Sequence, residues 1–564
     1  MDEIEKAIAT LAKPKKPRGR PAKAVSDELP ESGSAELTGE RTDLANAGRL
    51  VEWHGDALRF VAAWNKWLAW DGTRWRADDN GGAERRAHAT ARRLAGEAQQ
   101  QLFDAMSAQR MRPDDPRAAK AGARARDLFK WAIDSQSGSR LAATLKLARC
   151  NAALAITQTE LDRDRHALNV ANGTVDLRTG ALRPHARADL NTKLAPHAYD
   201  PGALCSTWDA FLLRAMGGDV ELVGYIQRLV GYSLTGDTSE QLLAFCYGKG
   251  SNGKSTFLGT LRSLLGDYST VAARGLLFRR KGGGERHPTE LASLFGARFV
   301  VVPEVEEGSA FDEALIKDLT GGDAISCRRM GEDFWSFEAS HKLWLAGNHR
   351  PVVKGNDHGI WRRIKLIPWT VLVPDHEKDI HLSAKLAAEA PGILRWAVAG
   401  AIEWHAKGLQ QPAVVRDASE KYRKESDATG QFFDERMVFG PKEIIVRSEL
   451  RKVYLAWCEE TGNLPLGARA LGERLRERGA SDGKVRVYGK PVDGWRGLRL
   501  ATEHDAVQKE AVVGSENIIQ FPRSGEISAY GNRAEGGNSL AKSLPTTGTD
   551  EHYEHAFSDL LDEP

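Results

Sequence analysis

The run GKGSNGKS, from Gly248 to Ser255, matches the spacing G-x-x-x-x-G-K-[ST]. Glycines let backbone N–H groups curl around phosphate oxygens, Lys254 brings positive charge to the β and γ phosphates, and the Ser255 hydroxyl is a ligand for Mg²⁺. The apolar run LLAFCY precedes the loop and the helical TFLGTLRSLL follows it, as a strand-loop-helix site requires. We therefore expect ATP and Mg²⁺ to bind here. The expected nucleotide-binding residues are Gly248, Lys249, Gly250, Ser251, Asn252, Gly253, Lys254, Ser255 and Thr256.

An acidic residue follows a second apolar run, ARFVVVPEVEEG, about fifty residues after Lys254. A carboxylate at the end of a buried strand can hold Mg²⁺ and polarise the water that attacks the γ phosphate, and Glu304 is the candidate for both duties. Pro303 directly precedes it, which leaves the division of labour among Glu304, Glu306 and Glu307 open. An acidic turn without a chemical role is the alternative interpretation.

Two further segments could complete a hydrolytic site. Asn348 closes the run HKLWLAGNHRP, where an amide could orient the lytic water, although most such segments are simple turns. Arg362 and Arg363 follow fourteen and fifteen residues later. One of them could be an arginine finger that reaches the γ phosphate of a neighbouring subunit, and a solvated arginine pair is the alternative.

Taken together, GKGSNGKS, VVVPE, LIKDLTGGDAISCRRM, LWLAGN and IWRRI resemble the superfamily 3 helicase domain, and more narrowly the helicase part of phage and plasmid primase-helicases. The flanking segments NVANGTVDLRTG, YDPGALCSTWDAFL and APGILRWAVAGAIEWHAKGL are similar to helicase-flanking segments of that family, so the resemblance covers roughly residues 50 to 500. It implies a homohexameric ring around single-stranded DNA at a fork, ATP sites between subunits and 3′ to 5′ translocation. It also implies that Lys254, Glu304, Asn348 and either Arg362 or Arg363 carry the hydrolysis.

The same resemblance implies a hairpin between the second and third motifs that faces the central channel. Lys317, Arg328 and Arg329 are then the candidates for contacts with the DNA phosphate backbone. Near the N-terminus, KPKKPRGRPAK resembles an AT-hook whose Arg18 and Arg20 would enter a narrow minor groove. A basic tail that only improves solubility is the alternative for that segment.

A chain of 564 residues suggests three or four folded units. We expect a multidomain α/β protein with a P-loop AAA+-like α/β ATPase core, a helical N-terminal region and a C-terminal winged-helix-like module, which would hold DNA or stabilise an oligomer. The expected ranges are a disordered basic tail at 1–45 with the AT-hook-like residues 17–21, a mostly helical helicase-associated region at 46–235 with a β-hairpin near 168–185, the superfamily 3 ATPase domain at 236–375, a helical extension at 376–440, the winged-helix-like domain at 441–505 and a disordered tail at 506–564.

Composition excludes several classes. The net charge of +2 leaves no general basic coat for nucleic acid, and five scattered cysteines without a C-x-x-C pair argue against structural zinc and a disulfide framework. No apolar run approaches the length of a membrane span or a signal peptide, so we expect no membrane partner and a place in the cytoplasm of a bacterial host.

A primase would need its own domain with clustered metal-binding carboxylates, and no such region precedes the ATPase motifs. The sequence therefore predicts a helicase that works beside a separate primase or polymerase. Alternatives that share the loop are an ATP-dependent loader, a DNA-packaging ATPase and an initiator that uses ATP as a switch.

Overall fold

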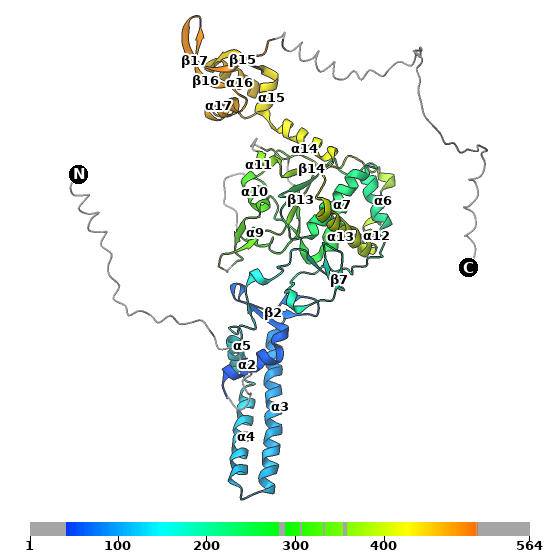
Figure 1. The fold of residues 1–564 in the computed structure, drawn as a ribbon, viewed down its shortest axis with the longest axis vertical. Coiled ribbons are helices and arrows are strands. Elements are labelled where there is room, and N and C mark those ends of the chain that lie inside the picture. Colours follow the sequence, from blue (N-terminus) through cyan, green and yellow to red (C-terminus); the bar gives the residue numbers. More distant parts are fainter. Residues whose placement is uncertain are drawn as a thin grey trace, which may run out of the picture. The chain divides into compact units, whose positions relative to one another are not determined.

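The computed structural model describes residues 41–280, 288–304, 307–330, 333–353, 358–502 and 505, and it has a mixed α/β architecture (Figure 1). The chain divides into two units, which are described separately: unit 1 is Met1–Asp434 with Ala456–Gly467, and unit 2 is Glu435–Leu455 with Ala468–Pro564. Among the described residues, no helix is long and apolar enough to cross a membrane. Arg18 and Arg20 lie outside the described residues.

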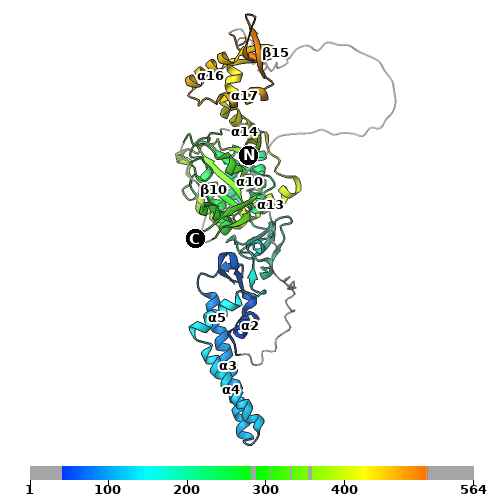
Figure 2. The same cartoon turned by 90° about the vertical axis from the view of Figure 1, so that its left-hand side faces the viewer.

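Unit 1 begins with helices and a small sheet. The helices are α2 (Asp43–His54), α3 (Gly82–Met111), α4 (Pro116–Asp134) and α5 (Gly138–Ala148). Helices α3 and α4 lie side by side as a long helical hairpin in both views (Figures 1 and 2). Asp115 ends the connection between them by capping α4, since its carboxylate accepts from the Arg117 N–H.

The tryptophan-rich stretch after α2 forms strands, which the expectation of a mostly helical region missed. The sheet has the order β3-β2-β1-β4, with β1 (Leu58–Val61), β2 (Lys66–Trp70), β3 (Trp75–Ala77) and β4 (Ala155–Ile156). Aromatic side chains favour a pleated surface because they pack across strands. Phe60 and Trp67 pair in register with ring centroids 5.1 Å apart.

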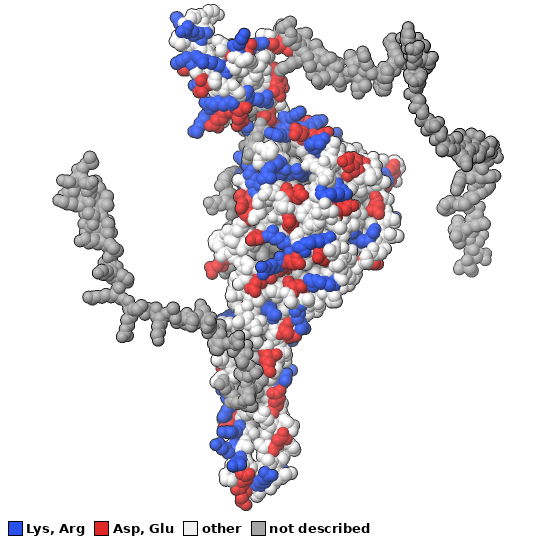
Figure 3. Space-filling view, viewed as in Figure 1, with Lys and Arg blue, Asp and Glu red and all other residues white. Residues whose placement is uncertain are grey.

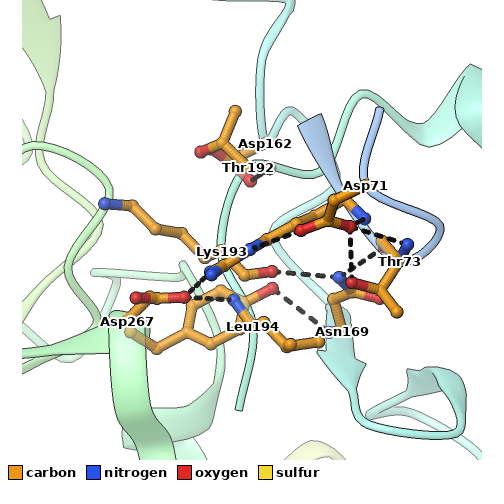
Figure 4. Close-up of polar contacts among 10 residues, drawn as sticks. Asp71, Thr73, Asp162, Asn169, Thr192, Lys193, Leu194 and Asp267 are labelled. Atoms are coloured by element: carbon orange, nitrogen blue, oxygen red, sulfur yellow. Dashed lines mark hydrogen bonds and ion pairs between the residues drawn. The ribbon is translucent and has the colours of Figure 1, made fainter. Parts of the chain in front are cut away.

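A three-stranded antiparallel sheet follows at the position of the expected hairpin. It consists of β5 (Ala167–Val170), β6 (Gly173–Asp176) and the short β7 (Leu182–Arg183). A polar junction joins this sheet to its neighbours in unit 1 (Figure 4). Asn169 donates from its side chain to the carbonyls of Thr73 and Lys193, and its N–H donates to the Tyr268 hydroxyl. Arg74 pairs with Asp267. One buried amide therefore ties three segments that are distant in sequence.

The core of unit 1 is a five-stranded parallel sheet with the order β14-β8-β13-β10-β9. The strands are β8 (Leu243–Tyr247), β9 (Ser269–Val271), β10 (Phe299–Val302), β13 (Lys342–Gly347) and β14 (Ile364–Pro368). The helices of this part are α6 (Ser206–Ala215), α7 (Val220–Leu234), α8 (Lys254–Leu265), α9 (Thr289–Ala292), α10 (Glu313–Gly321), α11 (His358–Trp361), α12 (Leu382–Ala388), α13 (Ala390–Lys407), α14 (Ala413–Ser426) and α15 (Ala428–Arg436).

Strand β8 is buried on both faces, which explains its unbroken apolar sequence. Ala244 and Cys246 face the cluster that includes Phe257 of α8. Leu243 and Phe245 face the opposite cluster, which includes residues of α10 and Tyr422 of α14. The sheet is therefore a rigid layer between two cores, and it fixes the loops at the ends of its strands.

A small hairpin and the elements that follow α15 complete the described chain. Strands β11 (Ala324–Cys327) and β12 (Trp335–Glu338) form an antiparallel hairpin after α10. The later elements are β15 (Met437–Val446), α16 (Arg447–Thr461), α17 (Ala468–Glu477), β16 (Ser481–Val487) and β17 (Lys490–Leu500), with sheet order β15-β17-β16. Two helices precede the β16–β17 hairpin, and the strand β15 lies before them.

Candidate functional site

The Gly248–Ser255 loop joins the central strand β8 to helix α8, and its glycines have steric reasons to be glycine. A Cβ on Gly248 would lie 2.0 Å from the Trp369 carbonyl oxygen, so no larger residue fits there. Gly253 caps the helix with φ of 86°, a conformation that side chains disfavour. A Cβ on Gly250 would meet nothing within 4 Å, so this side of the loop is open. The loop thus presents its backbone beside the N-terminus of α8.

Neighbouring segments hold the loop in place. Asn252 is buried, and its side-chain N–H donates to the Trp369 carbonyl at 2.8 Å. The Trp369 N–H in turn donates to the carbonyl of Tyr247 at 2.7 Å. On the other side, the Val373 N–H donates to the Ser251 carbonyl at 2.9 Å. Sequence reasoning missed Trp369 and Val373 because they act through backbone atoms, for which side-chain type gives no signal.

Lys254 is buried at the first position of α8, and its ammonium group meets three acceptors. These are the Gly248 carbonyl, the Asn252 side-chain oxygen at 3.1 Å and the Asn348 side-chain oxygen at 3.1 Å. Burial lowers the pKa of Lys254, and the nearby Glu304 carboxylate opposes that shift. The lysine is therefore held at the loop, in a place where an added anion would favour its charged form.

Glu304 and Asn348 come together because they follow neighbouring parallel strands, β10 and β13. The Asn348 backbone N–H donates to one carboxylate oxygen of Glu304 at 2.6 Å, and its side-chain N–H lies 3.4 Å from the other. Asn348 thus links the carboxylate to the Lys254 ammonium group. Among the described acids that follow β10, Glu307 lies apart, 3.5 Å from the His349 ring. Glu306 lies outside the described residues.

Ser255 and Thr256 begin α8 next to this network. The Ser255 side chain is exposed and that of Thr256 is half-buried, and both line a cavity of about 240 Å³ beside α12 and α13. A serine hydroxyl and a carboxylate are hard oxygen ligands of the kind that Mg²⁺ takes. Ser255 and Glu304 each offer such an oxygen, and Glu304 lines a second cavity beside Gly347 and His349.

Arg362 and Arg363 lie at the opposite end of the sheet, just before β14. Arg363 is 7% exposed and donates to the Thr320 hydroxyl at 2.9 Å and to the Gly359 carbonyl at 2.7 Å. Arg362 is exposed and donates to the Gln241 side chain at 2.5 Å. Within one chain, neither guanidinium group joins Lys254, and only that of Arg362 is exposed.

The expected DNA-contacting residues have different surroundings. Arg328 follows β11, is exposed, and lies over the Phe334 ring at 5.0 Å. Arg329 is half-buried between the rings of Trp64 and Trp335, 5.3 Å from each centroid. Lys317 is half-buried on α10. The aromatic contact of Arg329 joins the hairpin to the N-terminal sheet region, which sequence reasoning did not anticipate because the two tryptophans are far apart in the chain.

Comparison with known families matches two segments of the chain. Residues 47–217 match the family described as D5 N terminal like. Residues 246–363, which contain the loop, Glu304, Asn348 and both arginines, match a family of unknown function, DUF5906.

Several viral proteins are similar in sequence to this chain. The chain is 26% identical over 300 residues to a protein named "Putative helicase" of Acanthamoeba polyphaga mimivirus, which covers 49% of this chain and 31% of the relative. It is 24% identical over 302 residues to a "Putative helicase" of Frog virus 3, covering 50% and 30%. A "Putative primase" of African swine fever virus is 21% identical over 330 residues, covering 54% and 34%. The chain spans about a third of the length of these relatives.

Among solved structures, the NrS-1 C-terminal region (305-718) has 10% sequence identity and a TM-score of 0.43, and the match covers 81% of this chain and 100% of that one. The two matched segments and the viral relatives are consistent with a resemblance to the primase-helicases of phages and viruses.

Proposed function

We propose that the chain is an ATP-dependent DNA helicase of superfamily 3 with a P-loop AAA+-like core. The observation that carries the proposal is the chain of hydrogen bonds from Lys254 through Asn348 to Glu304 beside the glycine loop. A cation, an amide and a carboxylate at the carboxyl ends of parallel strands suit the positioning and hydrolysis of a nucleotide γ phosphate. The helicase names of viral relatives support the same activity.

In this proposal, the residues of the site divide phosphate binding, metal binding and proton transfer among them. The open backbone from Gly248 to Gly253 and the N-terminus of α8 bind the phosphates, and Lys254 supplies charge to the β and γ groups. Ser255 and Glu304 would hold Mg²⁺, which neutralises phosphate charge when bound. The Glu304 carboxylate accepts the proton of the attacking water, and Asn348 fixes that carboxylate through its backbone N–H.

Arg362 is the proposed arginine finger. Its exposed side chain lies at the opposite end of the sheet from Lys254, so it would serve a site on another copy of the chain. Arg363 is buried against Thr320 and is the proposed support for that region. A head-to-tail arrangement forms a ring when the rotation between copies closes, and the proposed homohexamer requires this geometry.

The proposed DNA contacts lie on the β11–β12 hairpin. Arg328 provides an exposed guanidinium group beside the exposed ring of Phe334, a pair that suits backbone contact with base stacking. Lys317 is a second candidate, and Arg329 contacts tryptophans on its side of the hairpin. We further propose that the protein moves 3′ to 5′ on single-stranded DNA and works beside a separate primase or polymerase. The elements β15 to β17 are proposed to form a winged-helix-like module that holds DNA or stabilises the oligomer.

The test is ATP hydrolysis and strand separation with purified full chain. Lys254→Ala should reduce DNA-stimulated ATP turnover at least about a hundredfold, because one preorganised charge at the phosphate is lost. The matched control is Lys249→Ala, which removes an exposed side chain of the same loop but keeps the backbone N–H proposed to bind phosphate, so turnover should stay nearly full. Unwinding should require a 3′ single-stranded tail.

An ATP hydrolysis rate that changes neither on addition of DNA nor in Lys254→Ala would refute the proposal. Turnover stimulated by DNA without strand separation would instead favour a loader or a packaging ATPase.

A further inference from the structure

Unit 2 contains a groove that lies outside the proposed ATP site and outside the DNA contacts proposed for Lys317 and the β11–β12 hairpin. It encloses about 690 Å³ between α16, α17 and the β16–β17 hairpin. Its apolar lining comes from Val446, Leu450, Leu471, Leu475, Val492 and Trp495. Its charged lining comes from Arg447, Arg451, Arg469, Arg476, Asp482 and Asp493. The groove therefore combines an apolar floor with four arginines against two aspartates.

The arginines differ in how far their charge is already paired. Arg447 and Arg476 share the Asp482 carboxylate at 3.5 and 3.3 Å, and their guanidinium groups lie near the Trp495 ring. The Arg469 side chain is 94% exposed, and among the described residues it forms an ion pair only with Glu473, one turn along the same helix. Lys and Arg side chains also gather on the surface of this part of the chain (Figure 3). The rim therefore has positive charge to offer an acidic ligand.

The sequence supplies such a ligand at residues 550–564, DEHYEHAFSDLLDEP, which lie outside the described residues. This segment has six acidic residues and neither lysine nor arginine. Tyr553, Phe557, Leu560 and Leu561 have the i, i+4, i+7, i+8 spacing that forms one apolar stripe on a helix. Both of its properties, acidic charge and an apolar stripe, complement the groove.

The chain is long enough for this contact. Between Asp505, the last described residue, and Asp550 lie 44 residues, whose full extension spans at most ~160 Å. Tethering to the same chain also raises the effective concentration of the segment at the groove. We propose that residues 550–564 dock in the groove of unit 2 as an amphipathic helix, with their apolar stripe on the floor and their carboxylates at the arginine rim.

The other occupant that an arginine rim suggests is the phosphate backbone of DNA. A phosphate backbone has no apolar group to bury on a floor that includes Leu471 and Trp495, whereas the 550–564 segment has four. The inference is independent of the ATP site, because no groove residue belongs to the Lys254 network.

The experiment uses the chain truncated after Gly548 and a fluorescent peptide of residues 548–564, with binding measured by anisotropy. The truncated chain should bind the peptide at least about tenfold more tightly than the full chain, whose own segment competes. A rise in salt from about 50 to about 300 mM should weaken binding several-fold, because charge pairing at an open rim is screened. A peptide with alanine at positions 557, 560 and 561 should lose most of its affinity.

Arg469→Glu in the truncated chain should weaken peptide binding about tenfold, since it reverses the most exposed charge on the rim. The matched control is Arg486→Glu, an exposed arginine of β16 that does not line the groove, which should leave affinity unchanged. Equal binding of a scrambled peptide would overturn the proposal. Loss of duplex DNA binding in Arg469→Glu with unchanged peptide binding would also overturn it, because the groove would then serve DNA.

Discussion

The charged side chains at the two ends of the parallel sheet in unit 1 differ in their surroundings. At the carboxyl ends of the strands, Lys254 and Glu304 lie close together through Asn348, beside a loop with an open side. At the amino ends, Lys342 is 2% exposed and Arg363 is 7% exposed, and both are satisfied by groups of their own chain. The charged groups at the carboxyl end lie beside an open loop, whereas the buried charged groups at the amino end hold the fold.

Arg362 is the exception at the amino end, and it provides the sharpest test of this contrast. Its guanidinium group is exposed beside the buried Arg363. Arg362→Ala should reduce ATP turnover by about a thousandfold, because an arginine finger stabilises charge on the transferring phosphoryl group. Arg363→Ala should instead lower the thermal unfolding midpoint, since it removes hydrogen bonds to Thr320 and Gly359.

Mixing two inactive variants distinguishes an effect between subunits from one within a subunit. Arg362→Ala subunits keep Lys254, and Lys254→Ala subunits keep Arg362, so about a quarter of the interfaces in an equal mixture are complete. Turnover in the mixture should therefore recover well above that of either variant. A mixture as inactive as its components would contradict a finger that acts between subunits.

The buried character of the amino end should also appear as a pH dependence of stability. His341 is 3% exposed next to Lys342, and burial lowers its pKa from 6.5 to about 4. As pH falls below 6.5, the unfolded chain takes up a proton that the folded chain takes up only near pH 4. The free energy of unfolding should therefore fall by about 3 kcal/mol between pH 6.5 and pH 4 because of His341 alone.

Urea titration of the full chain at several pH values measures this loss. His341→Leu should flatten the dependence between pH 6.5 and 4 relative to the parent chain, while His88→Leu, an exposed histidine on α3, should retain the parent slope. Identical slopes in all three proteins would show that His341 does not titrate as a buried group.

Much of the carboxyl end could be predicted from sequence, and the reason is geometric. Parallel strands end at one edge of a sheet, so residues such as Glu304 and Asn348 that follow apolar runs come together there. The amino end could not be predicted in the same way. Arg362 and Arg363 are adjacent and chemically identical, and only packing against Thr320 makes one buried and the other exposed.

Other features were missed for related physical reasons. The strands around Trp67 carry aromatic residues without a clear two-residue alternation, so their sequence resembles an amphipathic segment. The contact of Trp64 with Trp335 depends on tertiary packing across a long stretch of sequence. Such long-range contacts leave no pattern in the local sequence, because the contact does not constrain the residues that flank each tryptophan.

At the carboxyl end of the sheet, a substitution of Glu304 should reduce ATP hydrolysis more than it reduces ATP binding. Glu304→Gln keeps an oxygen for the Asn348 N–H and for Mg²⁺ but loses the group that takes a proton, so turnover should fall about a hundredfold while the loop and Lys254 still bind the nucleotide. Glu307→Gln is the matched control, since Glu307 is exposed and lies beside His349. A larger loss in Glu307→Gln would move the role of general base to that residue.

Asn252 should give the smallest effect, and it tests whether the loop is preorganised. Its side chain bonds the Trp369 carbonyl and accepts from Lys254, so Asn252→Ala removes a support of the loop without removing a group that contacts phosphate. We expect the KM for ATP to rise about tenfold, the equivalent of one or two hydrogen bonds, with little change in kcat. Ser251→Ala is the matched control in the same loop: within the described part of the chain, its exposed hydroxyl accepts only from Lys378, at 3.1 Å, and the substitution keeps the backbone of the loop. A fall in kcat with unchanged KM would instead mean that Asn252 stabilises the transition state. The loop at the carboxyl end would then take part in the reaction and would not serve only as a preformed binding site.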